Sequence, residues 1–215
     1  MWNMQLFMSE MAFPAPKEFQ KMFRVGITGG IGAGKSVVSR ILRCNGFHVY
    51  DCDVRAKFLM TNDLCLKKEL QEHIGEEVYL KDGALNKKFL SEKIFKDSQV
   101  RSLVNGLVHR AVRLDIEEKC NKGLNFIESA IPVTGGLVPK LDKIWIVEAP
   151  LNIRIERTIT RDSLTESEVV NRIVTQEKEF SDLPFHKKSY IQNDDKDSII
   201  VRIIKLLEEL RELHY

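Results

Sequence analysis

Short apolar segments rich in strand-forming residues recur along the chain, and helical patterns separate them. We expect strands at 23–28, 47–50, 125–131, 143–150 and 190–193. Between them, apolar residues recur three and four positions apart, which is the spacing of a helix with one buried face. The segment from Ser198 onward shows this stripe most clearly, at Ile199, Ile200, Ile203, Ile204, Leu207 and Leu210. Strands that alternate with helices predict an α/β fold with a parallel sheet.

The stretch from 54 to about 120 contains helical patterns and no expected strand. One helix is expected to end near Gly75, and Asn86 and Asp97 are expected to cap two more. The helix after Asn86 is expected to bury four apolar side chains: Phe89, Leu90, Ile94 and Phe95. The helix after Asp97 is expected to bury five: Val100, Leu103, Val104, Leu107 and Val108. This excursion between strands has the size of a small substrate-binding domain.

Residues 29–36, Gly-Gly-Ile-Gly-Ala-Gly-Lys-Ser, match the phosphate-binding pattern G-x-x-x-x-G-K-[ST] between a strand and a helical pattern. Glycines let backbone N–H groups approach a phosphate, and the following helix adds the positive end of its dipole. Lys35 would reach the β- and γ-phosphates, and the Ser36 hydroxyl would bind Mg²⁺. A dinucleotide-binding loop fits less well, because Lys35 occupies the place of its third glycine. We therefore expect a nucleoside triphosphate with Mg²⁺.

Two carboxylates, Asp51 and Asp53, follow the second expected strand. Side chains at the carboxyl end of a strand in an open α/β sheet lie on the ligand side. Asp53 also precedes a helical pattern, so the structural alternative for it is a helix N-cap, and both roles can hold together. Because the phosphate-binding loop lies one βα unit upstream, we favour a catalytic role for Asp53.

Arginines are concentrated in two short predicted helices. Three of them share one face of the helix expected at 151–160: Arg154, Arg157 and Arg161. Thr165 and Glu168 form a capping box that opens the next helix, where Arg172 and Gln176 lie four apart. The ordinary alternative is a solvated basic face. Converging arginines instead predict a lid over phosphates, because the planar guanidinium binds phosphate oxygens bidentately.

Composition narrows the class of protein. With 215 residues, 43% hydrophobic and 30% charged, the chain suits a soluble α/β domain with an insertion. A net charge of +2 gives no global field that favours nucleic acid or a membrane, and no apolar run is long enough to span one. The four cysteines form no C-x-x-C pair, which indicates free thiols in a reducing cytoplasm. Residues 1–22 are interpreted as an upstream extension, with a packed arm as the alternative.

These motifs together resemble the dephospho-CoA kinase family. The resemblance is carried by the loop 27–36 and by 46–53 with its Asp-Cys-Asp ending, and it runs along most of 23–208. It implies a three-layer P-loop kinase fold with a parallel sheet, a helical substrate-binding insertion and a short helical lid. The implied division is an extension 1–22, a core of 23–56, 121–150 and 181–215, a helical acceptor (CoA) domain 57–120 and a lid 151–180.

The resemblance also implies an activity: ATP-dependent phosphorylation of the 3′-hydroxyl of the dephospho-CoA ribose, the final step of coenzyme A biosynthesis. It implies ATP and Mg²⁺, a cytoplasmic location and no nucleic-acid or membrane partner, and it leaves the oligomeric state open. Catalytic roles fall to Asp53, Lys35 and Arg161. ATP binding falls to Gly30, Gly32, Ala33, Gly34, Lys35, Ser36, Val37, Arg157 and Asn193. Acceptor binding falls to Asp51, Asp53 and His109, and metal binding to Ser36.

The chain departs from the family pattern at two places. The family commonly has His-Pro where this chain has His109-Arg110, and a glutamate after the third strand where this chain has 131–134, Ile-Pro-Val-Thr. Both departures concern the acceptor pocket. The alternatives that stay open are a P-loop kinase for another small hydroxyl acceptor, such as a nucleoside monophosphate, and a non-catalytic nucleotide-binding regulator. A GTPase is disfavoured, because 121–124 lacks the aspartate that reads guanine.

Overall fold

The computed structural model describes residues 13–194 and 196–213, which form two compact units. The described residues of 13–50 and 120–213 form the first unit, and Asp51–Lys119 forms the second. Most of the extension expected at 1–22 lies outside the described residues. Within the described part of it, Phe19 is buried, with its ring centroid 6.1 Å from that of Phe47. Residues near Phe19 therefore pack on the first unit, as the alternative interpretation of a packed arm expects.

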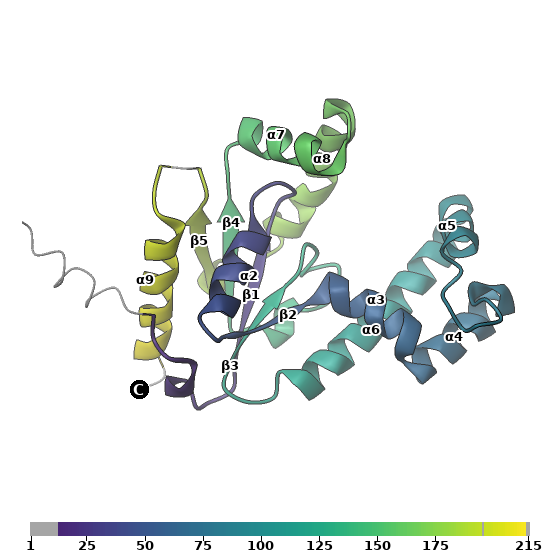
Figure 1. Ribbon diagram of the computed structural model, residues 1–215, viewed down its shortest axis with the longest axis horizontal. Helices are drawn as coiled ribbons and strands as arrows, with labels where there is room; N and C mark the ends of the chain where they lie inside the picture. The colour runs from purple at the N-terminus through teal and green to yellow at the C-terminus, as the bar shows by residue number, and fades with distance from the viewer. Residues whose placement is uncertain (1–12, 195, 214–215) are drawn as a thin grey trace, which may run out of the picture. The chain divides into compact units, whose positions relative to one another are not determined.

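One parallel sheet forms the centre of the first unit (Figure 1). Its order is β2-β3-β1-β4-β5, and the strands span His48–Asp51 (β2), Leu124–Glu128 (β3), Phe23–Gly29 (β1), Lys143–Glu148 (β4) and Lys188–Gln192 (β5). The central strand β1 pairs parallel to β3 and β4, with Val25 opposite Phe126 and Ile27 opposite Trp145. The predicted α/β fold with a parallel sheet is confirmed.

Helices of the first unit lie before, between and after the strands. They span Pro16–Glu18 (η1), Lys35–Cys44 (α2), Val138–Lys140 (η3), Leu151–Asp162 (α7), Glu166–Ser181 (α8), Phe185–Lys187 (η4) and Ile199–Glu212 (α9). The predicted capping box is present, because Thr165 and Glu168 exchange hydrogen bonds at the start of α8. In the predicted stripe of α9, Ile200 is the exception, since 44% of it is exposed.

The core of the first unit lies against β1, β3, β4 and β5. Consecutive residues of β1 are buried, as expected for a parallel strand covered on both faces. Val25 and Ile27 belong to a cluster that contains Phe126 and Trp145 together with side chains of α2 and α9. Gly26 points to the opposite face, where a Cβ would lie 2.6 Å from the Leu141 side chain. The two faces of β1 are therefore covered by different parts of the chain.

Two predicted strands end earlier in the structure. The strand expected at 125–131 ends at Glu128, because the chain turns there: the N–H of Ile131 donates to Ser129 Oγ and Pro132 has no N–H. The strand expected at 143–150 ends at Glu148, two residues before α7 begins. Both corrections shorten the strands at their carboxyl ends, which is where the loops of the candidate site begin.

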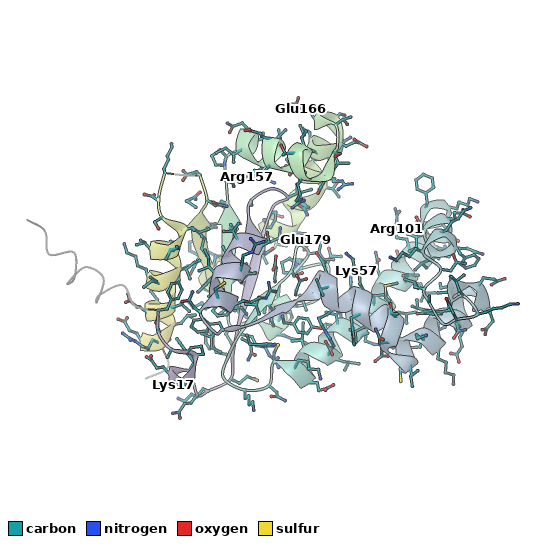
Figure 2. All side chains as sticks on the ribbon, viewed as in Figure 1. Lys17, Lys57, Arg101, Arg157, Glu166 and Glu179 are labelled. Atoms are coloured by element: carbon teal, nitrogen blue, oxygen red, sulfur yellow. The ribbon has the colours of Figure 1, made fainter. Side chains whose placement is uncertain are left out.

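The second unit is helical. Its helices span Cys52–Asn62 (α3), Leu64–Ile74 (α4), Glu76–Val78 (η2), Lys87–Lys96 (α5) and Ser98–Lys119 (α6). The long helix α6 contacts α3, α4 and α5, while charged residues such as Lys57 and Arg101 are exposed (Figure 2). Among the helices in the described parts of both units, none is long and apolar enough to cross a membrane.

The predicted helix ends of the second unit are confirmed, whereas the predicted buried faces are partly wrong. Asn86 caps α5 and the side chain of Asp97 accepts N–H groups of the first turn of α6, while Gly75 ends α4. Of the four side chains expected to be buried by α5, Leu90 is buried and Phe95 is 89% exposed. Five residues of an α-helix turn through about 500°, so Phe95 points well away from the buried face of Leu90.

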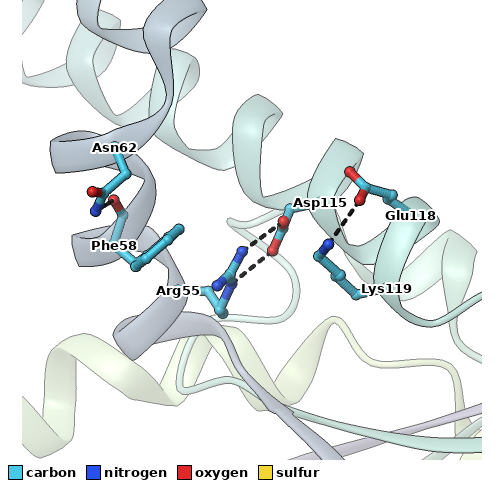
Figure 3. A network of polar contacts seen from close by, with 6 residues as sticks. All are labelled: Arg55, Phe58, Asn62, Asp115, Glu118 and Lys119. Carbon is cyan, nitrogen blue, oxygen red and sulfur yellow. Dashed lines mark hydrogen bonds and ion pairs between the residues drawn. The ribbon is translucent and has the colours of Figure 1, made fainter.

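An ion pair within the second unit joins α3 to α6 (Figure 3). Two nitrogens of Arg55 donate to the two carboxylate oxygens of Asp115, each at 2.8 Å, and Asp115 is buried. The same guanidinium lies 4.4 Å from the centroid of the Phe58 ring. A bidentate pair of this kind fixes both side chains. It therefore holds the first turn of α3, which contains Arg55, against α6.

Candidate functional site

The phosphate-binding loop connects β1 to α2, because β1 ends at Gly29 and α2 begins at Lys35. Gly32 and Gly34 have φ angles of 77° and 98°, which side-chain-bearing residues rarely adopt. A Cβ at Gly32 would also overlap with the Arg154 carbonyl oxygen. The first N–H groups of an α-helix have no acceptor within the helix; in α2 the Val37 N–H donates to the carbonyl oxygen of the loop's Gly34 at 2.9 Å. The predicted strand, loop and helix are therefore present.

Lys35 extends back along this loop. Its Nζ donates to the carbonyl oxygen of Gly29 at 2.7 Å and to that of Gly30 at 3.4 Å. Ser36 and Val37 follow in the first turn of α2, where both are exposed. The structure thus places an ammonium group, a hydroxyl group and the start of a helix at one loop, an arrangement that suits a polyphosphate.

Asn193 links the loop to two other elements. Its Nδ2 donates to the Ala33 carbonyl oxygen at 2.9 Å, and its backbone N–H donates to the Glu148 carbonyl oxygen at 2.8 Å. Its own carbonyl oxygen accepts from Arg157 Nη1 at 3.2 Å; Arg157, on α7, is labelled in Figure 2. Two of the predicted ATP-binding residues, Asn193 and Arg157, therefore contact each other beside the loop.

The three arginines of α7 have different partners. Arg154 Nε donates to the Ile31 carbonyl oxygen at 3.0 Å, so it contacts the loop directly, and Arg157 contacts Asn193. Arg161 makes a bidentate contact with Asp162, with Nε 2.7 Å from Oδ1. Its guanidinium, hydrogen-bonded to that carboxyl group, lowers the pKa of Asp162. The predicted stripe thus divides into one residue at the loop, one beside Asn193 and one at the exposed end of α7.

Sequence reasoning placed Arg154 and Gln176 in the lid but did not assign them to the loop. Gln176 Oε1 accepts the N–H of Ile31 at 2.8 Å, so both backbone groups of Ile31 bind side chains of α7 and α8. A pocket of about 380 Å³ lies beside this contact, lined by Ile31, Asn171, Arg172, Thr175 and Gln176. The sequence features that pointed to these residues were the spacing of the arginines and the Arg172–Gln176 pair. Neither feature indicates which side chains of the lid contact the loop.

The segment after β3, where the family pattern has a glutamate and this chain has 131–134, Ile-Pro-Val-Thr, contacts a carboxylate of α8. Glu179 of α8 is buried, and its carboxylate accepts the N–H of Val133 at 2.9 Å (Figure 2). It also accepts the N–H of Thr134 at 3.2 Å and the Thr134 hydroxyl. Val133 and Thr134 therefore have a carboxylate partner that lies 46 and 45 residues further along the chain, respectively.

The second unit holds the predicted acceptor residues, and one of their structural roles needs correction. The N-cap of α3 is Asp51, whose Oδ1 accepts the N–H of Val54 at 3.0 Å. Asp53 is not the cap: it lies in the first turn of α3 with its side chain exposed. Since Asp51 already satisfies the helix start, the Asp53 carboxylate is not needed for capping.

His109 is half-buried on α6. Its neighbour Arg110 forms an ion pair with Glu69 of α4. The Arg110 guanidinium therefore already has a carboxylate partner on a neighbouring helix. The arginine in place of the family's proline lies in the interior of a helix, where a proline would remove a backbone hydrogen bond.

The larger pocket lies elsewhere. About 530 Å³ in volume, it is formed by β5, α9 and the residues before α9, and no residue of the predicted site lines it. Ile31 of the phosphate-binding loop lines the smaller pocket and not this one. Within the described residues, no three side chains of His, Cys, Asp or Glu gather as a metal site. A loop that binds Mg²⁺ through one hydroxyl and substrate phosphates needs no such cluster.

Comparison with known proteins agrees with this geometry. The sequence model of the dephospho-CoA kinase family matches residues 23–197. The dephospho-CoA kinase of Porphyromonas gingivalis is 35% identical over 193 residues, covering 88% of this chain and 95% of the relative. A crystal structure of a Thermus thermophilus protein aligns with a TM-score of 0.68 and 27% identity, covering 90% of this chain and 98% of the other.

A fourth comparison supports the fold. The dephospho-CoA kinase from Campylobacter jejuni aligns with a TM-score of 0.60 and 21% identity, covering 89% of this chain and 98% of the other. The family match includes the phosphate-binding loop, both helices with the arginines, and Asn193. This chain belongs to the dephospho-CoA kinase family.

Proposed function

We infer that this chain transfers the γ-phosphoryl group of ATP to the 3′-hydroxyl of the dephospho-CoA ribose, the final step of coenzyme A biosynthesis. The observation that carries this inference is the loop between β1 and α2, with Lys35 on its carbonyl groups and Ile31 held by two lid side chains. Family membership supports the choice of acceptor. The reduced cysteines expected from the sequence favour the cytoplasm.

The first unit would bind ATP. The N–H groups at the start of α2 and the Lys35 ammonium would neutralise phosphate oxygens, Arg157 would stabilise charge on the transferring phosphoryl group, and Asn193 would lie near the adenine. Ser36 fits an Mg²⁺ ion, since its hydroxyl is an exposed oxygen donor at the loop and Mg²⁺ prefers a few protein oxygens with substrate phosphates. Bound there, Mg²⁺ would supply positive charge at the β- and γ-phosphates.

The second unit would bind the acceptor. An exposed carboxylate in the first turn of a helix, which Asp53 provides, can orient a hydroxyl group and accept its proton. We assign this role to Asp53, with Asp51 and His109 as further acceptor contacts. Residues 57–120 are proposed as the acceptor domain and 151–180 as the lid.

The test of this function is ATP consumption with a panel of acceptors. Dephospho-CoA, nucleoside monophosphates and shikimate are each supplied with ATP and Mg²⁺, and ADP formation is followed. We expect ADP in amounts stoichiometric with dephospho-CoA and little without an acceptor. ATP hydrolysis that ignores the acceptor, preference for a nucleoside monophosphate, or nucleotide binding without turnover would each contradict the proposal.

Arg161 offers a test of the lid. Because charge builds up on the transferring phosphoryl group, a lid arginine stabilises the transition state more than the bound substrates. Arg161→Ala is expected to lower the turnover number by about tenfold, with a smaller change in acceptor affinity. Steady-state kinetics beside Arg43→Ala, an exposed arginine of α2, give the comparison. An unchanged turnover number would show Arg161 to be part of a solvated face.

A further inference from the structure

Ile31 is the residue of the phosphate-binding loop whose two backbone groups both bind side chains from distant helices. Its N–H donates to Gln176 Oε1 of α8 at 2.8 Å, and its carbonyl oxygen accepts from Arg154 Nε of α7 at 3.0 Å. Two directional contacts on one residue fix the peptide planes on both of its sides. We propose that Arg154 and Gln176 are positioning residues, which hold the phosphate-binding loop in its phosphate-accepting conformation.

The contact of Gln176 orients the peptide before Ile31. In a trans peptide the C=O and N–H groups point in opposite directions, and the described chain has no cis peptide bonds. With the Ile31 N–H directed at Gln176, the Gly30 carbonyl oxygen points the other way. There it accepts the N–H of Ala33 at 3.1 Å and Lys35 Nζ at 3.4 Å. Gln176 thereby aligns the acceptor that closes the loop and anchors the lysine.

The contact of Arg154 orients the peptide after Ile31. The Ile31 carbonyl oxygen is directed at Arg154, so the N–H of Gly32 in the same peptide plane points away from that side chain. This direction makes the Gly32 N–H a donor for a phosphate oxygen. In the absence of Arg154 the plane could rotate, because glycine at 32 places few steric limits on it.

The backbone of α7 reinforces this arrangement. A Cβ at Gly30 would overlap with the Arg154 guanidinium, and one at Gly32 would overlap with the Arg154 carbonyl oxygen. That carbonyl oxygen accepts the hydroxyl of Thr158 at 2.7 Å, and Thr158 is fully buried. The start of α7 is therefore packed directly on the loop. The start of α7, where Arg154 lies, supports the conformation of the loop. The other end of α7 is exposed and contains Arg161.

The experiment measures ADP affinity, by titration calorimetry in the presence of Mg²⁺. Arg154→Met and Gln176→Met remove one hydrogen bond each with a small change in size, and each is expected to weaken ADP binding about tenfold. The double variant should weaken it about tenfold as well rather than a hundredfold, because both contacts hold the same residue. Dephospho-CoA affinity should change less than twofold.

Matched controls place methionine at exposed neighbouring positions, Glu156→Met on α7 and Val174→Met on α8. Both are expected to bind ADP as the unaltered protein does. If Gln176→Met fails to fold, Gln176→Asn withdraws the same acceptor from reach with a smaller change in packing. Hydrogen exchange of the Ile31 amide adds an independent readout, and it should be slow in the unaltered protein and at least tenfold faster without the Gln176 acceptor.

Two results would overturn the proposal and leave both residues with a structural role only. One is that the effects of the two substitutions on ADP affinity are fully additive. The other is that ADP affinity stays within twofold of that of the unaltered protein although the melting temperature falls. The inference rests on the proposed ATP site, but different results would contradict the proposed function and the positioning role. If the unaltered protein does not bind ADP, the proposed function is wrong. If it binds ADP and both methionine variants bind equally well, only the positioning role is wrong.

Discussion

Asp53→Asn is expected to lower the turnover number by about 10³-fold while ATP affinity stays within a few-fold of that of the unaltered protein. A positioned general base contributes roughly 10²- to 10⁴-fold, and an amide cannot accept the proton of the attacking hydroxyl. The substitution should leave α3 intact, since Asp51 rather than Asp53 caps that helix. Turnover is measured as dephospho-CoA-dependent ADP formation, and ATP affinity by equilibrium titration.

Asp97→Asn is the matched control for Asp53→Asn. Asp97 is an exposed cap at α6, and asparagine caps a helix about as well as aspartate. The control should retain normal turnover. Turnover of Asp53→Asn at the rate of the unaltered protein would remove Asp53 from the chemistry and leave it as an exposed residue of a first helical turn.

Lys35→Ala should impair both nucleotide binding and phosphoryl transfer. The ammonium lies on the Gly29 and Gly30 carbonyl oxygens, so its loss removes a charge from the loop and a contact that shapes it. Removing one preorganised electrostatic contact typically costs about 10²- to 10³-fold in turnover, and ATP affinity should fall as well. Lys35→Ala should therefore lower both turnover and ATP affinity, whereas Asp53→Asn should lower turnover and leave ATP affinity nearly unchanged.

Lys17→Ala makes the same chemical change at an exposed position of η1 and should alter neither quantity. Circular dichroism and thermal melting of Lys35→Ala check that the fold is retained. A folded Lys35→Ala protein with normal ATP affinity and turnover would contradict the assignment of this loop as the ATP site.

Features confined to a few neighbouring residues were predictable from the sequence. The phosphate-binding loop occupies eight consecutive residues, and the caps at Asn86 and Thr165 depend on partners three positions away. The order of the strands in the sheet could not be predicted from such local patterns, although the alternation of strands and helices predicted that the sheet is parallel. Element ends were less accurate: Asp53 was considered as a cap, whereas the helix starts two residues earlier with Asp51 as its cap, and sequence alone does not fix a helix start to within two residues.

The contacts around Ile31 and 132–134 were beyond the reach of local patterns. Arg154 lies 123 residues from its partner Ile31, Gln176 lies 145 residues from the same partner, and Glu179 lies 46 residues from Val133. A charge stripe shows which side chains share a helix face, but not what that face meets. For α5, the five-residue offset between Leu90 and Phe95 already placed them on different faces, but which of the two faces is covered depends on tertiary packing, and the structure buries Leu90 and exposes Phe95.

The second unit is one uninterrupted stretch, Asp51–Lys119, which leaves the sheet after β2 and rejoins it before β3. Because β2 and β3 are neighbours in the sheet, this stretch can be exchanged as a cassette with only two junctions. The Arg55–Asp115 pair and the contacts of α6 with α3, α4 and α5 lie inside this stretch and would be exchanged together. The phosphate-binding loop and its supporting helices lie outside it and would not change. Under the proposed division, with ATP bound by the first unit and the acceptor by the second, this exchange would transfer the acceptor site without altering the phosphate-binding loop.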